Sequence, residues 1–313
     1  MTKEKGSVRI EYFLMLIVSF FWAIGHPFGR IIVSKVHPFQ LGTVTLSTGF
    51  IGLLIFLTVS GRIKKISELS SRELFVSLGL GIFGFFFYQI LTFSALARIP
   101  ASMNAVLVST NVVFIALLAA LILKERILPI RIAGIAIALI GVILVTFNTG
   151  FTLGKDGGSI NLLGCAFSLL AALSFSIYSV IGKKILTSND PLVVAVLALF
   201  SGSVLLNIFT ASTVGYADIF RAGWPTFLLM VFLGLTMIGI AYPLWFTCLK
   251  RLPASHASIY IYLTPVFAVI LSLIILRERF SWLFWVGGAC ILCGIIITNR
   301  FAAAKGKSDS VNE

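Results

Sequence analysis

A small set of polar and aromatic side chains interrupts long apolar stretches, and these residues have the chemistry that could serve a function. Trp22, His26 and Arg30 are spaced four residues apart, so a helix places them on one face. His256 and Tyr260 repeat this spacing later in the chain. An aromatic surface beside an imidazole or hydroxyl group is suited to non-covalent recognition of a solute.

Six more candidates lie in apolar stretches: Tyr88, Gln89, Asn111, Tyr178, Tyr242 and Trp245. Polar groups at membrane depth cost free energy unless they find partners, so we expect these faces to point inward. With Trp22, His26, His256 and Tyr260, the six form the predicted substrate-binding set. Two alternatives stay open: His26 could make a structural hydrogen bond to a neighbouring helix, and His256 could be a solvated residue near its helix start.

Acidic residues are expected to be missing from the middle of the apolar stretches. All 11 Asp and Glu residues fall at predicted helix ends, in loops or in tails. Exporters that exchange protons for cationic drugs generally need a buried carboxylate, so neutral, zwitterionic or anionic solutes fit better. Cys290 and Cys293 have metal-like spacing but no nearby His or acidic partner. We therefore predict no metal, no cofactor and no catalytic residues.

The composition of the chain predicts which kind of secondary structure contains these residues. The 313-residue chain is 59% apolar and 11% charged, with a mean hydropathy of +1.07, whereas soluble domains carry about 25% charge. A helix of about 20 apolar residues crosses a bilayer. We expect an all-α integral membrane protein with ten transmembrane helices, at about 12–34, 38–60, 73–97, 100–123, 128–147, 161–183, 190–213, 224–249, 253–276 and 281–299.

The net charge of +13 does not predict nucleic-acid binding, because the basic residues are scattered at helix ends. With both termini in the cytoplasm, 17 of the 24 Lys and Arg residues fall on the cytoplasmic side, as the positive-inside rule requires. The sequence therefore predicts a multi-pass protein of the cell (inner) membrane with cytoplasmic N- and C-termini.

The chain contains an internal repeat. Residues 97–127 and 250–280 align without a gap at an offset of 153, and each carries an Arg-x-Pro-Ala-Ser and a Glu-Arg motif. We interpret Glu125 and Glu278, beside Arg126 and Arg279, as interfacial charge clusters. The predicted units are a first five-helix repeat at 1–150, a second at 151–300 and a disordered cytoplasmic tail at 301–313.

Five spans in each half imply that the second half enters the membrane inverted. Inverted repeats are typical of transporters whose substrate site lies near mid-bilayer between the halves. Glycines recur seven apart in the fifth and tenth helices, at Gly134/Gly141 and Gly287/Gly294. These faces allow close packing, either against the body of the protein or against a second copy in a homodimer.

The chain resembles the EamA-type, ten-helix carriers of the drug/metabolite transporter superfamily. The resemblance rests on "FFWAIGHPFGR", "FSIYSVIGKK" and the two Pro-Ala-Ser…Glu-Arg blocks; one departure is Val112, where the family usually has proline. It implies a central cavity lined by helices one, three, four, six, eight and nine. The implied function is secondary-active or facilitative export of small metabolites, such as amino acids, by alternating access.

A different class of function is a membrane-embedded enzyme acting on a lipid or isoprenoid substrate. Such an enzyme would need paired carboxylates or a histidine cluster near the interface, and neither is evident. A transporter that binds a small molecule within the lipid bilayer is the better interpretation.

The charge asymmetry makes the topology testable. Reporter fusions after Lys65 and after Lys307 are expected to be cytoplasmic, and a fusion after Lys155 is expected on the opposite side. A cytoplasmic signal from the Lys155 fusion would contradict the ten-span topology.

Overall fold

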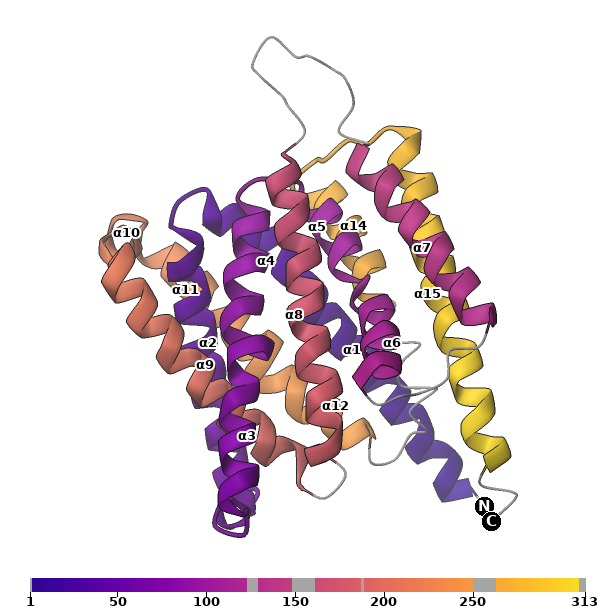
Figure 1. Cartoon of the computed structure of the whole chain (residues 1–313). Coiled ribbons are helices and arrows are strands. Elements are labelled where there is room, and N and C mark those ends of the chain that lie inside the picture. The colour runs from indigo at the N-terminus through magenta and orange to yellow at the C-terminus, as the bar shows by residue number, and fades with distance from the viewer. Residues whose placement is uncertain (1, 123–128, 148–160, 187–188, 250–262, 310–313) are drawn as a thin grey trace.

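The described part of the chain is helical throughout. The computed structural model describes residues 2–122, 129–147, 161–186, 189–249 and 263–309, and all regular structure in these ranges is helical (Figure 1). Seven helical segments there are long and apolar enough to span a membrane, and three shorter helices are also apolar. The prediction of an all-α, multi-pass membrane protein is confirmed. The count of ten spans stays a prediction.

The first half of the chain holds two long helices followed by several broken ones. Its elements are α1 (Thr2–Val33), α2 (Pro38–Val59), η1 (Arg62–Ile66), α3 (Ser71–Gly81), η2 (Ile82–Phe87), α4 (Tyr88–Leu96), α5 (Ala101–Val108), α6 (Asn111–Ile122) and α7 (Pro129–Phe147). η1 is a 3₁₀-helix and η2 is a π-helical turn.

The second half follows a similar order. Its elements are α8 (Leu162–Leu186), α9 (Pro191–Thr213), α10 (Ala217–Arg221), α11 (Gly223–Gly234), η3 (Leu235–Ile240), α12 (Ala241–Leu249), α14 (Leu263–Ile275) and α15 (Trp282–Asp309). α15 continues past the expected boundary into the segment predicted to be a disordered tail. Its alanine-rich composition there favours helix. α1 begins and α15 ends at the same end of the bundle (Figure 1).

Several helices begin where the sequence supplies a cap. His37 and Gln40 form a capping box at the start of α2, and Ser70 and Glu73 form another at the start of α3. The side chain of Asp190 accepts a hydrogen bond from the Leu192 amide and so caps α9. These polar caps satisfy amide groups that a helix start leaves without an intrahelical partner.

Two π-helical turns, η2 and η3, lie at the same position in the two halves. η2 begins at Ile82, and η3 begins at Leu235, 153 residues later. This separation equals the offset of the sequence repeat. π-helical turns inside α-helices are uncommon and often lie at functional sites. Their recurrence extends the repeat from residue identity to local backbone conformation.

Glycine contacts between the halves also occur in matched pairs. A Cβ atom on Gly81 of α3 would overlap the carbonyl oxygen of Ala198 in α9. A Cβ atom on Gly234 of α11 would overlap the carbonyl oxygen of Thr45 in α2. Gly234 and Ala198 are the 153-residue counterparts of Gly81 and Thr45. In each half, therefore, the third span packs closely on the second span of the other half.

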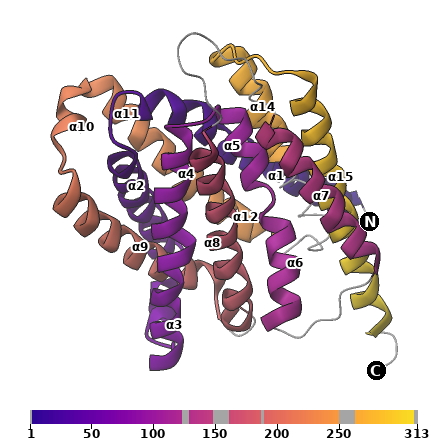
Figure 2. The same cartoon turned by 45° about the horizontal axis from the view of Figure 1, so that its top comes forward.

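The predicted glycine faces of α7 and α15 contact each other within one chain. A Cβ atom on Gly287 would lie 2.9 Å from the carbonyl oxygen of Gly141, and one on Gly294 would lie 2.5 Å from that of Gly134. The two helices lie side by side at one edge of the bundle (Figures 1 and 2). A homodimer through these helices stays a prediction, and it would have to use their other faces.

The recurring Pro-Ala-Ser and Glu-Arg motifs join the two halves. Pro100 at the start of α5 has no side-chain cap of its own. Instead, the Glu278 carboxylate accepts hydrogen bonds from the amides of Ala101 (2.8 Å) and Ser102 (3.2 Å), and from the Ser102 hydroxyl (2.6 Å). A carboxylate at a helix N-terminus also complements the helix dipole. We call this contact the Glu278 clasp.

The Glu278 clasp corrects the interpretation of this motif as a charge cluster with Arg279. Arg277 has a φ of 53°, a left-handed conformation that non-glycine residues seldom adopt, and Glu278 follows it directly. Arg30 of α1 interacts electrostatically with Glu278 and donates a hydrogen bond to the carbonyl of Leu96, which ends α4. Glu125 and Arg126 lie outside the described residues.

The Glu278 clasp predicts a stability effect. Glu278→Ala removes three hydrogen bonds to a carboxylate and leaves two amides at a helix start, so we expect a loss of about 2 kcal/mol. Glu278→Gln, which keeps one acceptor oxygen, should lose less. The measurement is the thermal unfolding midpoint of the purified protein in detergent. Glu68→Ala, at an exposed position, is the control, and an equal shift in that variant would contradict the role of the Glu278 clasp.

Candidate functional site

Aromatic side chains from α1 and α12 contact one another. The ring centroid of Trp22 lies 6.0 Å from that of Tyr242 and 5.5 Å from that of Trp245. α1 comes from the first half of the chain and α12 from the second. This contact therefore forms between the two halves.

The aromatic contacts continue from Tyr242 toward α4. Phe85 of η2 lies 6.0 Å from Tyr242 and 5.6 Å from Tyr178, between ring centroids. Phe175 of α8 lies 5.7 Å from Tyr178 and 5.6 Å from Tyr88. Together with Trp22 and Trp245 these residues form one network, which we call the aromatic chain. It contains all five aromatic residues predicted for the site in the described spans.

Two members of the aromatic chain, Phe85 and Phe175, were not predicted as site residues. Phe175 carried a usable signal, because it is the 153-residue counterpart of Trp22. Phe85 is one of 28 phenylalanines, and nothing in its local pattern distinguishes it. Only its ring contacts with Tyr178 of α8 and Tyr242 of α12 identify Phe85 as part of the aromatic chain.

The two π-helical turns contact the first helix of the opposite half. The indole Nε1 of Trp22 donates to the carbonyl of Met237 in η3 at 3.0 Å, and the Ser174 hydroxyl of α8 donates to the carbonyl of Phe83 in η2 at 2.8 Å. A π-helical turn changes the local hydrogen-bond register, and side chains can satisfy the carbonyls involved. Trp22 is thereby held in a defined orientation within the aromatic chain.

Glycines admit large side chains at these two crossings. A Cβ atom on Gly84 would overlap the ring of Tyr178, and a Cβ atom on Gly25 would overlap the side chain of Met237. Met237 is the 153-residue counterpart of Gly84, and Tyr178 is the counterpart of Gly25. The two contacts are therefore equivalent, with the roles of the two halves exchanged. Trp22, Tyr88, Tyr242 and Trp245 remain partly exposed, whereas Tyr178 is buried. The aromatic chain thus keeps accessible ring surface that could contact a solute.

The predicted polar residues are placed in several different environments. The Gln89 amide donates to the hydroxyl of Thr45 at 3.1 Å, so it links α4 to α2. Asn111 begins α6, and its backbone carbonyl accepts a hydrogen bond from Ser176 of α8 at 2.9 Å. His256 and Tyr260 lie outside the described residues.

His26 is buried in α1, with 8% of its surface exposed. One turn earlier on the same helix, Ala23 packs with Ala105 of α5 and Ala268 of α14. The Nδ1 atom of His26 has no hydrogen-bond partner in the described part of the protein. Among the described residues, therefore, no group accepts or donates the structural hydrogen bond that was the alternative role for His26 through this nitrogen.

Glu11 lies where acidic residues were expected, but it is buried. It lies inside α1 as the second residue of the candidate span Ile10–Val33, and only 3% of its surface is exposed. The Cys248 thiol of α12 contacts the Glu11 backbone carbonyl at 3.7 Å. Glu11 is thus at the end of a span, as predicted, but it is packed against α12 rather than solvated. The Asp190 side chain is also buried, with 3% of its surface exposed, but it lies at the start of α9 in ion pairs with Arg62 and Lys65.

The sequence matches the EamA-like transporter family over residues 9–147 and again over residues 162–300. These two matches cover most of the chain, and each corresponds to one predicted repeat. The chain therefore belongs to the EamA-like transporter family.

Curated relatives of similar length carry transporter names. An uncharacterized transporter of Clostridium kluyveri is 29% identical over 288 residues, covering 91% of this chain and 92% of the relative. The uncharacterized transporter YetK of Bacillus subtilis is 25% identical, covering 95% and 90%. A probable terminal-alkyne amino-acid exporter of Streptantibioticus cattleyicolor is 29% identical, covering 74% of each chain. These similarities point to a membrane transporter rather than an enzyme.

A solved crystal structure of another protein shares the fold. It aligns with a TM-score of 0.65 at 21% identity and covers 95% of this chain and 98% of the other. The helical arrangement is therefore one that has been observed in another protein.

Proposed function

We propose that this protein is a secondary-active or facilitative carrier that exports small, partly apolar metabolites, such as amino acids, by alternating access. The observation that carries the proposal is the aromatic chain, which crosses between the two halves and keeps exposed ring surface. Aromatic rings bind apolar parts of a solute, while tyrosine hydroxyl and indole groups can hydrogen-bond its polar parts.

We infer that the two halves are inverted repeats of five spans each. The contacts between the halves support this inference. Gly81 contacts Ala198, and their 153-residue counterparts, Gly234 and Thr45, contact each other in the same way. The location of the start of α1 and the end of α15 at one end of the bundle fits an even number of spans. Together with the distribution of basic residues, this favours ten spans with cytoplasmic termini in the cell (inner) membrane.

The substrate class follows from the charge of the site. The two buried acidic side chains that are described, Glu11 and Asp190, lie at the ends of their spans rather than at mid-span. Without a carboxylate at mid-span, an organic cation has no anionic partner there, which favours neutral, zwitterionic or anionic solutes. The name of the Streptantibioticus cattleyicolor relative as a probable amino-acid exporter agrees with a zwitterionic solute.

Alanine substitution of the aromatic chain tests the proposed site. Replacement of Trp22, Tyr88, Tyr178, Tyr242 or Trp245 removes ring surface from the proposed site, and a variant with any two replaced should weaken transport by about tenfold or more. The measurement is uptake of labelled amino acids by proteoliposomes containing equal amounts of folded protein.

Trp282→Ala is the matched control, because this tryptophan is 70% exposed outside the aromatic chain. Its transport should equal that of the wild type. Normal transport by all five single alanine variants would contradict a shared binding site.

His26 is the side chain at which proton coupling can be tested. Its pKa in water is about 6.5, near neutrality, but the middle of the spans offers no carboxylate to relay a proton. We therefore expect facilitated or exchange transport, in which a pH gradient leaves the rate unchanged for wild type and for His26→Gln. The measurement is the initial rate in proteoliposomes with and without the gradient.

A gradient-driven wild type would contradict this expectation. If His26→Gln then lost the response, His26 would be the coupling site. If the variant kept the response, Glu11→Gln would be tested next, since Glu11 is also a buried titratable group in α1.

A further inference from the structure

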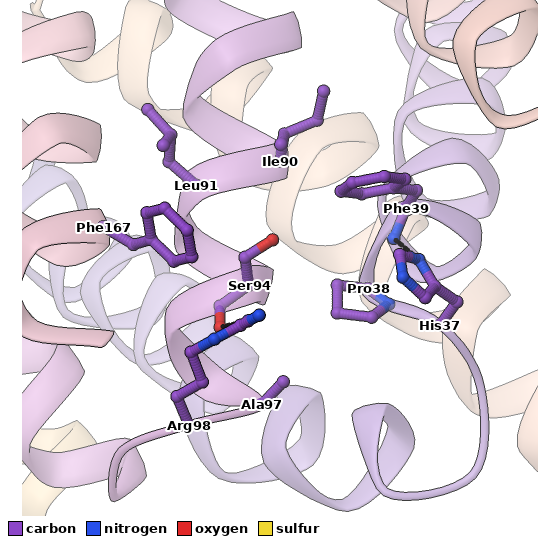
Figure 3. A pocket seen from close by; sticks show the side chains of 9 residues that line it. All are labelled: His37, Pro38, Phe39, Ile90, Leu91, Ser94, Ala97, Arg98 and Phe167. Atoms are coloured by element: carbon purple, nitrogen blue, oxygen red, sulfur yellow. Dashed lines mark hydrogen bonds between the residues drawn. The ribbon is translucent and has the colours of Figure 1, made fainter. Parts of the chain in front are cut away.

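A pocket of about 510 Å³ lies outside the aromatic chain, where α2 begins, α4 ends and α8 passes both. It is at the end of the bundle opposite the start of α1. Figure 3 shows that its two ends differ: Ile90 and Leu91 lie at one end, and Arg98 and His37 lie toward the other. The pocket therefore has an apolar end and a polar end.

Arg98 carries the charge of the polar end. Its guanidinium lies over the Phe167 ring, 5.1 Å from the centroid, and one Nη1–H group donates to the Ser94 carbonyl at 2.8 Å. Arginine has five N–H donors, and within the described part of the protein no carboxylate is within ion-pair distance of Arg98. With respect to the described residues, most of its donors thus remain open to an anion from outside the protein.

His37 adds no charge to this end at neutral pH. Burial lowers the pKa of its imidazole, while Asp218 opposes the shift and Arg98 adds to it. The Nδ1 atom of His37 accepts a hydrogen bond from the amide of Phe39 at 3.3 Å, as part of the capping of α2. Asp218 itself accepts hydrogen bonds from Gln40 and Arg221. Among the described residues that line the polar end, Arg98 is therefore the one cation.

The apolar end continues into helix faces that the protein leaves exposed. Leu91 of α4 lines the pocket, and Phe87, one turn earlier at the end of η2, is exposed. Phe167 lines the pocket from α8, and Leu163 and Leu170 on its face of that helix are also exposed. α4 and α8 pack directly on each other. A molecule in the pocket would therefore contact the acyl chains of the surrounding bilayer.

We propose that this pocket binds an anionic glycerophospholipid, with the phosphate on Arg98 and the start of an acyl chain along Leu91 and Ile90. Guanidinium groups bind phosphate oxygens strongly, often with two hydrogen bonds. Basic pockets between transmembrane helices are suited to lipid headgroups. A free phosphate would match only the polar end, whereas a lipid matches both ends and reaches the site from the bilayer. This proposal does not depend on which solute the protein transports.

The test is native mass spectrometry of the full chain, delipidated in detergent and titrated with phosphatidylglycerol or phosphatidylcholine of identical acyl chains. Wild type is expected to bind phosphatidylglycerol more tightly. Arg98→Gln should weaken that binding by about tenfold, because a charge-assisted hydrogen bond is lost. Arg98→Lys should retain part of it. Arg279→Gln, at an exposed position between α14 and α15, is the matched control and should bind like wild type.

Leu91→Trp tests the apolar end without touching Arg98, and it carries the test if Arg98→Gln does not fold. Filling this end should weaken binding of both lipids. Equal binding of the two lipids by wild type, or unchanged phosphatidylglycerol binding in Arg98→Gln or Leu91→Trp, would overturn the proposal. Displacement of phosphatidylglycerol by an equal concentration of glycerol 3-phosphate would also overturn it, because the ligand would then be a soluble anion.

Discussion

Backbone hydrogen bonding in a medium without water is the constraint on which the rest of this structure depends. Inside a bilayer, every amide and carbonyl must find a partner within the protein. Uninterrupted helices meet this requirement locally, but this chain also begins a helix at Pro100 and contains the π-helical turns η2 and η3. At each of these places a side chain from the other half supplies a partner: Glu278 for α5, Trp22 for η3 and Ser174 for η2. The irregular backbone is therefore what ties the halves together.

The Glu278 clasp shows what one Pro-Ala-Ser motif and one Glu-Arg motif do. A proline before a helix prevents the usual Ser, Asp or Asn cap, and the glutamate that follows a span in the other half takes its place. Glycines at Gly81, Gly202, Gly234 and Gly49 then let the backbones approach closely enough for such contacts to form. Since packing between apolar helices in lipid gains little from the hydrophobic effect, close approach and interhelical hydrogen bonds must supply much of the association energy.

The aromatic chain and the pocket beside Arg98 use aromatic side chains differently. In the aromatic chain, rings from α1, α4, η2, α8 and α12 meet between the halves, and Trp22 is oriented by a carbonyl in η3. In the pocket, Phe167 supports a single guanidinium at the edge of the bundle. The first arrangement is suited to a solute that crosses the protein, whereas the second is suited to a molecule that stays in the bilayer beside it.

The sequence by itself determined the class of fold and the residues with an evident pattern. The length of the apolar runs predicted the membrane-spanning helices. The 153-residue offset predicted two similar halves, and the two π-helical turns lie at equivalent positions in these halves. These features are local or periodic, so they can be read along the chain. Tyr88, Tyr178 and Tyr242 were predicted as site residues in the same way, because they are aromatic residues with a polar hydroxyl in apolar stretches.

Only the tertiary structure decided which partner each polar group takes. Glu278 binds the start of α5 rather than joining Arg279, Gln89 binds Thr45, and Glu11 is buried against α12. The pocket beside Arg98 likewise needs α2, α4 and α8 together. Residue spacing predicts neighbours on one helix, but these partners are separated by tens to hundreds of residues. Their contacts depend on how the helices of the two halves pack, because close packing selects a few of many chemically equivalent pairings.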